Sequence, residues 1–320
     1  EGIICYNLKD KSFQHIKVSS NPADYQHTSI SEICYLKDNR FAISNKRFIY
    51  EMRFENENYA QTGYEIIRRV QYERQFEQLI RNRISDLYYD SDNHVLWIGT
   101  YGNGLVRQNI SHTFAYQIKL PVNIYHTNDI VQDSKGYIWL GTRKNGLLKS
   151  TDTELTENTH FKLWEKADAN GSYHLQKDRN GYLWIGSESG TIQKLNTSTG
   201  ELSTITPPDT VTNPAKDFVI QELFMNSRNR LWVATATSIG IYDENTGKWL
   251  VYKNYMKPYG RVTKIAEDAG GVIWLGTEHG LYEANVPLDI PNKINMTGGF
   301  EQEAGLIANE VLSIHVTNTN

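Results

Sequence analysis

The chain has 320 residues, of which 39% are hydrophobic and 22% charged, and its formal net charge at pH 7 is −4. This composition is that of a folded globular protein with enough apolar surface for a sizeable core. No run of lysine or arginine exceeds two residues, which argues against a nucleic-acid partner. No stretch approaches the roughly 20 apolar residues of a membrane-spanning helix, so we expect no direct membrane insertion.

The first 55 residues contain two β-rich segments. Residues 1–20 hold two short apolar runs, and residues 29–55 hold two more around the turn Asp38-Asn39-Arg40, with Phe41 near the place that tryptophan takes later. Cys5 and Cys34 stand in these apolar runs, where we expect buried free thiols. Residues 55–83 are an insertion rich in Glu, Arg, Gln and Tyr, for which we expect a helical turn or a long outer hairpin.

Five repeats follow between Ile84 and Asn285. Each has an apolar run, a turn, a second apolar run containing tryptophan, then Gly-Thr or its equivalent and a later glycine. Successive tryptophans are 42, 45, 48 and 42 residues apart, at Trp97, Trp139, Trp184, Trp232 and Trp274. A period of this length indicates a propeller, with tryptophan as the apolar plug between neighbouring blades.

The turns of the repeats share a fixed spacing. An Asp or Asn stands six positions before the tryptophan, and a Gly or Asn that tolerates positive φ stands three before it. The residues with this spacing are Asp133, Asp178 and Asp268, then Gly136, Gly181 and Gly271, with Asn226 and Asn229 in the fourth repeat. In the first repeat Asp90 lies seven positions before Trp97 and His94 takes the glycine place, so we expect a turn one residue longer.

The two ends of the chain complement each other. Residues 1–16 match the outer part of a repeat, and residues 308–320 match its inner strand. We therefore predict an all-β fold, a seven-bladed β-propeller of four-stranded antiparallel blades with one composite blade closed by N- and C-terminal strands. The tryptophan strand of that composite blade is missing from both ends, so it either precedes Glu1 in a longer parent protein or the blade has three strands.

The predicted blades form a single domain over residues 1–320. Their bounds are 308–320 with 1–20, then 29–55, 66–118, 124–165, 170–206, 217–255 and 260–295. Because the chain starts without an initiator Met and ends at what resembles the start of another repeat, we expect it to be part of a longer protein.

The pattern D-x-x-G-x-[LI]-W-[IL]-G-T followed by G-L resembles the two-component regulator propeller repeat. That resemblance implies a periplasmic sensor domain of a bacterial hybrid two-component histidine kinase, anchored in the inner membrane by another segment. In gut Bacteroidetes such domains are associated with oligosaccharide sensing. The resemblance therefore implies a non-catalytic domain with an oligosaccharide ligand, and a second propeller and a dimer partner in the parent protein.

Two other functions remain open. The chain could be a glycan-active lyase or hydrolase, or a pure protein-interaction scaffold, since propellers host many activities. The stretch 186–190, Gly-Ser-Glu-Ser-Gly, has the letters of a nucleophile elbow but occupies the Gly-Thr place of its repeat. Four residues before each turn, on the expected innermost strands, stand Asp86, Asp129, His174, Glu222 and Lys264. Their mixed charge disfavours a cation cage, and we predict no metal, no cofactor and no catalytic residue.

We place the candidate ligand site on the loops that follow Gly-Thr and those that precede each inner strand. Aromatic and planar hydrogen-bonding side chains in these loops suit sugars, and Arg143, Lys144 and Arg261 would suit an acidic sugar. The same residues could instead be solvated or could contact a neighbouring propeller. The candidate ligand-binding residues are Tyr101, Asn103, Tyr125, His126, Arg143, Lys144, Asn145, Tyr173, Glu188, Tyr259, Arg261, Glu278 and His279.

Overall fold

The computed structural model describes nineteen segments of the chain, and the statements below concern these alone. They are residues 3–6, 13–16, 30–45, 48–57, 59, 62–69, 84–102, 104–110, 115–121, 124, 126–153, 159–165, 173–187, 189–208, 220–252, 256, 258–286, 294–300 and 310–316. All regular structure in these segments is β-strand, which confirms the all-β prediction. None of them contains a helix long and apolar enough to cross a membrane.

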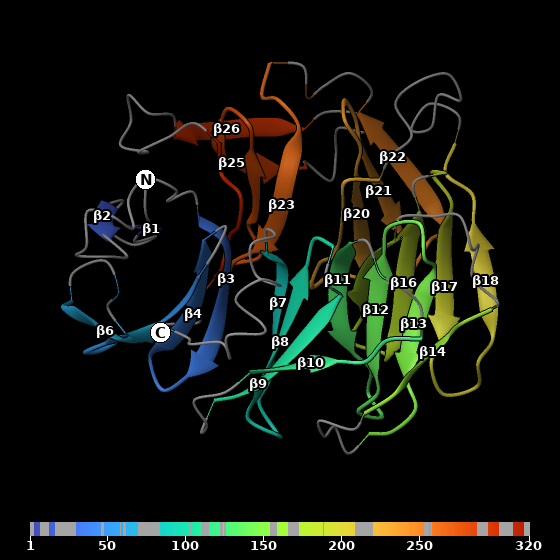
Figure 1. The fold of residues 1–320 in the computed structure, drawn as a ribbon. Helices are drawn as coiled ribbons and strands as arrows, with labels where there is room; N and C mark the ends of the chain where they lie inside the picture. The colour runs from blue at the N-terminus through green and yellow to red at the C-terminus, as the bar shows by residue number, and fades with distance from the viewer. Residues whose placement is uncertain are drawn as a thin grey trace.

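The strands form six four-stranded antiparallel sheets in chain order, which we number blades 1 to 6 (Figure 1). Blades 1 to 3 consist of β3 (Ile30–Lys37), β4 (Arg40–Asn45), β5 (Ile49–Phe54) and β6 (Tyr64–Arg69); β7 (Ile84–Asp90), β8 (Val95–Thr100), β9 (Leu105–Asn109) and β10 (Ala115–Ile118); and β11 (Thr127–Gln132), β12 (Ile138–Thr142), β13 (Leu147–Ser150) and β14 (Phe161–Leu163).

Blades 4 to 6 repeat the same order from the inner to the outer strand. They consist of β15 (Tyr173–Lys177), β16 (Tyr182–Ser187), β17 (Ile192–Asn196) and β18 (Leu202–Ile205); β19 (Glu222–Met225), β20 (Arg230–Ala234), β21 (Ile239–Asp243) and β22 (Lys248–Tyr252); and β23 (Val262–Glu267), β24 (Ile273–Thr277), β25 (Gly280–Asn285) and β26 (Asn295–Phe300). The inner strands contact one another in sequence from β3 to β23, so the blades follow each other around a ring (Figure 1). This confirms the propeller.

The prediction of seven four-stranded blades is wrong, because the described residues form six. In place of the composite blade, β1 (Ile3–Tyr6) and β2 (Phe13–Ile16) pair only with each other, and residues 310–316 form no strand. A strand needs a hydrogen-bonded neighbour on at least one side. The sequence contains no tryptophan strand that could lie between residues 310–316 and β1, so no four-stranded sheet forms there.

Residues 310–316 nevertheless lie between blade 6 and blade 1. The Val311 backbone N–H donates to the Thr277 carbonyl at 2.9 Å, and the Thr263 hydroxyl donates to the Val311 carbonyl. On the other side, Ser313 Oγ donates to Glu32 Oε2 at 3.3 Å. This segment therefore joins the last blade to the first.

Tryptophan side chains fill the spaces between neighbouring blades. Trp97, Trp139 and Trp184 have no exposed surface, and Trp97 packs in a cluster with Ile130 and Leu148 of the next blade. The glycine two residues after the tryptophan leaves room for this approach. A Cβ on Gly186 would lie 2.8 Å from Leu223 Cδ1 of blade 5, closer than real Cβ contacts.

The turn before each tryptophan is held by one side chain. Asp178 Oδ1 accepts the backbone N–H groups of Asn180 and Tyr182, and its Oδ2 accepts Trp184 Nε1–H at 3.0 Å. Asp133 and Asp268 make the same three bonds in their blades. The residue three before the tryptophan has positive φ in five blades, at His94, Gly136, Gly181, Asn229 and Gly271, where residues other than Gly and Asn are strained.

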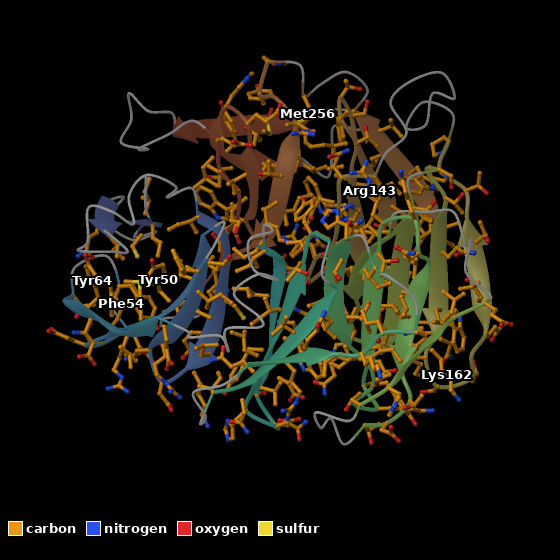
Figure 2. The ribbon with its side chains drawn as sticks, in the orientation of Figure 1. Tyr50, Phe54, Tyr64, Arg143, Lys162 and Met256 are labelled. Atoms are coloured by element: carbon orange, nitrogen blue, oxygen red, sulfur yellow. The ribbon has the colours of Figure 1, made fainter. Side chains whose placement is uncertain are left out.

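Blade 1 replaces the tryptophan by an aromatic cluster. The ring of Phe41 meets those of Phe54 and Tyr59 edge-on, with centroids 5.6 and 5.3 Å apart. Phe54 also lies 6.0 Å from Tyr64 of the outermost strand (Figure 2). The described part of the 55–83 insertion thus contains an outer strand, β6. Cys5 and Cys34 are free and partly exposed, and burial raises the pKa of both thiols to about 12.

Candidate functional site at the mouth of a central ring

Each of the six inner strands contributes one ionisable side chain to a common ring. The six residues occupy the same register, each opposite the Gly of Gly-Thr or its equivalent, and they are Glu32, Asp86, Asp129, His174, Glu222 and Lys264. We call these six residues the central ring. Five of them follow from the fixed spacing to the turn. Glu32 does not lie four residues before its turn, because β3 has a register shift between Tyr35 and Lys37.

Most members of the central ring link one blade to the next. Asp86 Oδ2 accepts the Ile130 backbone N–H of blade 3 at 2.7 Å. Asp129 Oδ2 accepts the Leu175 N–H of blade 4 at 3.0 Å and lies 3.1 Å from His174 Nδ1. The central ring therefore has a structural role between blades.

Two further contacts of the central ring lie on the two sides of blade 6. Lys264 Nζ of blade 6 lies 3.2 Å from Glu222 Oε1 of blade 5. Ser313 reaches Glu32 at 3.3 Å, as described above. The central ring thus has an ion pair between blades 5 and 6 and a hydrogen bond between residues 310–316 and blade 1.

Burial and mutual charge shift the ionisation of the central ring. Burial raises the pKa of Asp86 to about 7, with the charge of Asp129 adding to the effect, and burial also raises the pKa of Glu32 and Glu222. The negative charge of Glu222 raises the pKa of Lys264 in spite of burial. Lys264 therefore stays protonated, and the carboxyl groups whose pKa is raised are those of Glu32, Asp86 and Glu222.

The His174 and Asp129 pair behaves in the opposite way. Burial alone would lower the pKa of His174, but the hydrogen bond and the charge of Asp129 outweigh it and raise that pKa. Burial alone would raise the pKa of Asp129, but the hydrogen bond and the charge of His174 outweigh it and lower that pKa. Each group therefore favours the charged form of the other.

The described residues show no group of three or more His, Cys, Asp or Glu side chains arranged to hold a metal ion. All six members of the central ring already contact other protein groups.

A cavity of about 360 Å³ opens at one end of the central ring. Its lining comes from the starts of the inner strands of blades 1, 2 and 6, from Gln221 before β19, and from residues 310–312. The polar residues of the lining include Ser31, Glu32, Ser85, Tyr101, Arg261 and Glu310. Because Glu32 belongs to both, the cavity is continuous with the central ring.

Two of the candidate ligand-binding residues, Tyr101 and Arg261, line this cavity. The Tyr101 ring stacks on His126 with centroids 3.4 Å apart, and the two backbones form an isolated β-bridge between blades 2 and 3. Arg261 Nη2 lies 2.8 Å from Glu278 Oε1, and its backbone N–H donates to Glu278 Oε2 at 3.0 Å. Candidates from three different blades therefore meet near one end of the ring.

The remaining candidates lie elsewhere. His279 Nδ1 is 3.3 Å from the Pro258 carbonyl, and Tyr259 packs edge-on against Tyr282 with centroids 4.8 Å apart. Arg143 and Lys144 are exposed in the turn after β12, with Asn145 beside them, and Figure 2 labels Arg143 away from Lys162 of the outer strand β14. Asn103, Tyr125 and Glu188 lie outside the described residues, as does the side chain of Tyr173, which begins β15.

Several lining residues were not among the candidates. They are Ser31, Glu32, Ile84, Ser85, Gln221, Val262, Thr263, Glu310 and Leu312. Most of them occupy the first positions of an inner strand or the residue before it. The prediction considered only the loops that precede the inner strands and not the strands themselves. Residues 310–312 could not be assigned because their position depends on how the ring is joined.

The fold and the cavity define a β-propeller with a ligand-sized site at its axis. Residues 78–102, 119–144 and 168–189 match the family model described as two component regulator propeller. These three segments match the repeat that the resemblance in the sequence indicated. The repeats at Trp232 and Trp274 lie outside the matched residues.

Solved structures share the fold at low identity. The extracellular domain of BT4673 from B. thetaiotaomicron, described as a proposed hybrid two component system, superposes with a TM-score of 0.64 at 16% identity over 91% of this chain and 36% of that one. This chain thus spans about a third of that domain's length. A search of the curated proteins found no match to the sequence.

Two enzymes have the same fold. A catalytically inactive virginiamycin B lyase from Staphylococcus aureus, solved with quinupristin, has a TM-score of 0.64 at 14% identity over 91% of this chain and 90% of that one. A proposed 6-phosphogluconolactonase from Bacteroides uniformis has a TM-score of 0.67 at 12% identity over 97% and 92%. At these identities the likeness concerns the fold alone.

Proposed function

We propose that this chain is the non-catalytic, ligand-sensing propeller of a periplasmic two-component sensor, and that it binds an oligosaccharide in the cavity at the mouth of the central ring. The two component regulator repeats support the sensor role. The observation that carries the binding site is the cavity itself, with polar side chains from several blades converging on it.

The size and lining of the cavity suit a small polyhydroxylated ligand. Its volume of about 360 Å³ is within the roughly 300–1,000 Å³ typical of small-molecule sites. Tyr101 offers an aromatic face, on which the apolar face of a sugar ring can stack. The hydroxyl of Ser31 and the carboxylates of Glu32 and Glu310 offer partners for the sugar hydroxyls.

The location of the site suggests how binding is transmitted. The cavity includes residues 310–312, which lie between the last blade and the first. A ligand that contacts blade 1, blade 6 and this segment together would favour one relative arrangement of them. Only the difference in affinity for two arrangements can be passed on to a histidine kinase in the parent protein.

A periplasmic location follows from the same family argument. The BT4673 domains that share the fold are described as extracellular. A second propeller and a dimer partner would then receive the signal.

A glycan-active enzyme is the competing proposal, since two propellers of the same fold are a lyase and a proposed lactonase. Calorimetric titration of the purified chain with neutral, acidic and amino oligosaccharides, followed by chromatography of each mixture, separates the two. We expect saturable binding with the oligosaccharide recovered intact, and a roughly five- to thirtyfold loss of affinity in Tyr101→Ala, as for a lost stacking contact of about 1–2 kcal/mol. Tyr64→Ala on the outer strand is the control. Cleaved product would contradict the sensor role.

A further inference from the structure

We infer that the cavity selects a ligand carrying a protonated amine, such as an oligosaccharide with free amino sugars, over an acidic one. The inference rests on the proposed function, because it takes the cavity to be the ligand site. It reverses the expectation, drawn from the arginines and lysine in the sequence, that an acidic sugar would bind.

The charged groups of the cavity wall have an excess of carboxylates. Glu32 and Glu310 both line it, and Arg261 is the one Lys or Arg among the described lining residues. The charge of Arg261 is already balanced, since Glu278 accepts from both its guanidinium, at 2.8 Å, and its backbone N–H, at 3.0 Å. These bonds to Arg261 also lower the pKa of Glu278, which keeps it ionised.

The floor of the cavity also has more carboxyl groups than basic groups. Glu32 is its point of contact with the central ring, which contains four carboxyl groups and two bases. Lys264 is paired with Glu222 at 3.2 Å, and His174 is paired with Asp129 at 3.1 Å. Asp86 and Glu32 have no ion pair among the described residues, although the charge of Lys264 lowers the pKa of both against the effect of burial. An ammonium group entering from the cavity would therefore meet two carboxyl groups that lack a cation at bonding distance.

Glu32 is the group that a ligand amine would reach. Its carboxylate accepts from Ser313 Oγ at 3.3 Å, and no lysine, arginine or histidine of the described chain lies within ion-pair distance of it. A largely buried carboxyl group without a cation is unfavourable, which is why burial raises the pKa of Glu32. An ammonium group beside it would remove that cost through a charge-assisted hydrogen bond.

Two further lining residues fit the rest of such a ligand. Glu310 lies on the exposed rim of the cavity and offers a second carboxylate to an amine of the ligand. The Tyr101 ring also lines the cavity and can stack on a sugar or attract a cation through its π face. A neutral sugar would use the stacking but leave Glu32 and Glu310 without a cation.

Calorimetric titration with three trisaccharides tests the inference. The probes are a glucosamine trimer, an N-acetylglucosamine trimer and a galacturonic acid trimer, at a pH at which the glucosamine amines are protonated. We expect the glucosamine trimer to bind at least about tenfold more tightly than the N-acetylated one, as for one charge-assisted bond, and the acidic trimer to bind most weakly. Equal affinities, or tighter binding of the acidic trimer, would overturn the inference while leaving the cavity as the binding site. Binding of none of the three would count against the proposed function.

Variants assign the preference to Glu32. Glu32→Gln should lose about tenfold for the glucosamine trimer and keep its affinity for the N-acetylated trimer, which also shows that the variant is folded. Glu65→Gln is the matched control, because Glu65 is 63% exposed on the outer strand β6 and pairs with Arg53. If Glu32→Gln does not fold, Glu310→Gln on the exposed rim should lower amine affinity by a smaller factor. Unchanged selectivity in a folded variant at both positions would refute the assignment.

Discussion

Asp129 Oδ2 and His174 Nδ1 lie 3.1 Å apart across the joint between blades 3 and 4. The same Asp129 oxygen accepts the backbone N–H of Leu175 at 3.0 Å. One carboxylate therefore fixes both the side chain and the inner strand of the next blade. Because the two groups shift each other's pKa in opposite directions, this joint should depend on pH.

The pH dependence of this joint has a definite sign. The raised pKa of His174 means that its contribution is fully present below pH 6.5 and is lost as the pH rises through the raised value. The lowered pKa of Asp129 means that its contribution is present above about pH 4 and is lost as the pH falls through the lowered value. We predict that His174→Gln costs about 1–2 kcal/mol of unfolding free energy at pH 5.5 and clearly less at pH 9. Urea unfolding of both proteins at several pH values measures this difference, and a difference that is constant with pH would rule it out.

Trp232 lacks the hydrogen bond that three other blade tryptophans make. Asn226 Oδ1 accepts the N–H groups of Arg228 and Arg230. The other polar group of its side chain is NH₂, which donates hydrogen bonds and cannot accept one from the indole N–H. Trp232 Nε1 accordingly has no partner among the described atoms. We predict that Asn226→Asp, which supplies an acceptor there, raises the unfolding free energy by about 1 kcal/mol.

The reverse substitution is the control for that prediction. Asp178→Asn would place a donor opposite Trp184 Nε1, which now donates at 3.0 Å, and should lower the unfolding free energy by about 1–2 kcal/mol. Denaturant unfolding at pH 7 compares the two variants. If Asn226→Asp is neutral while Asp178→Asn is destabilising, the acceptor at Trp232 is not what the fourth turn lacks.

The repeat spacing was sufficient to predict the propeller and five members of the central ring. Local turn chemistry repeats with the blade, so Asp133 and Gly136 predict both a turn and the side chain four residues earlier on the inner strand. Glu32 was missed because a register shift in β3 breaks the spacing. The predicted number of blades was wrong because the N- and C-terminal segments match parts of one repeat but do not include its second strand. Without that strand, the two segments cannot pair into one sheet.

The cavity could be located only in part from the sequence. Tyr101 and Arg261 were among the candidates because they flank inner strands, and both line it. The ion pair between Arg261 and Glu278 could not be deduced, since it joins two loops of one blade whose geometry depends on the turn at Gly260. Glu310 and Leu312 come from a segment whose position depends on contacts with blades 1 and 6.

Lys264 and Glu222 form the ion pair at the joint of blades 5 and 6. Lys264→Met would leave Glu222 buried without its cation, and we expect a loss of about 2–3 kcal/mol in unfolding free energy, less than for a fully buried pair because the Lys264 side chain is 32% exposed. The double variant with Glu222→Gln should recover more than half of that loss. A double variant no more stable than Lys264→Met would show that the lysine acts through packing rather than charge.

Glu278 controls the charge available at Arg261. Glu278→Gln leaves the guanidinium at the rim of the cavity without its carboxylate, so we predict a two- to fivefold gain in affinity for the galacturonic acid trimer and a similar loss for the glucosamine trimer. The factors are modest because both side chains are partly exposed. Calorimetry at low and high salt measures them, and both changes should shrink as the salt increases.

The central claim is that a ligand binds at the mouth of the central ring. Amide hydrogen exchange, followed by mass spectrometry, should be measured with and without saturating glucosamine trimer. We predict slower exchange in peptides that contain residues 30–32, 84–86, 261–263 and 310–312, and no change in the outer strands β14 and β18. Slowing confined to outer strands, under conditions in which the trimer is bound, would contradict the claim.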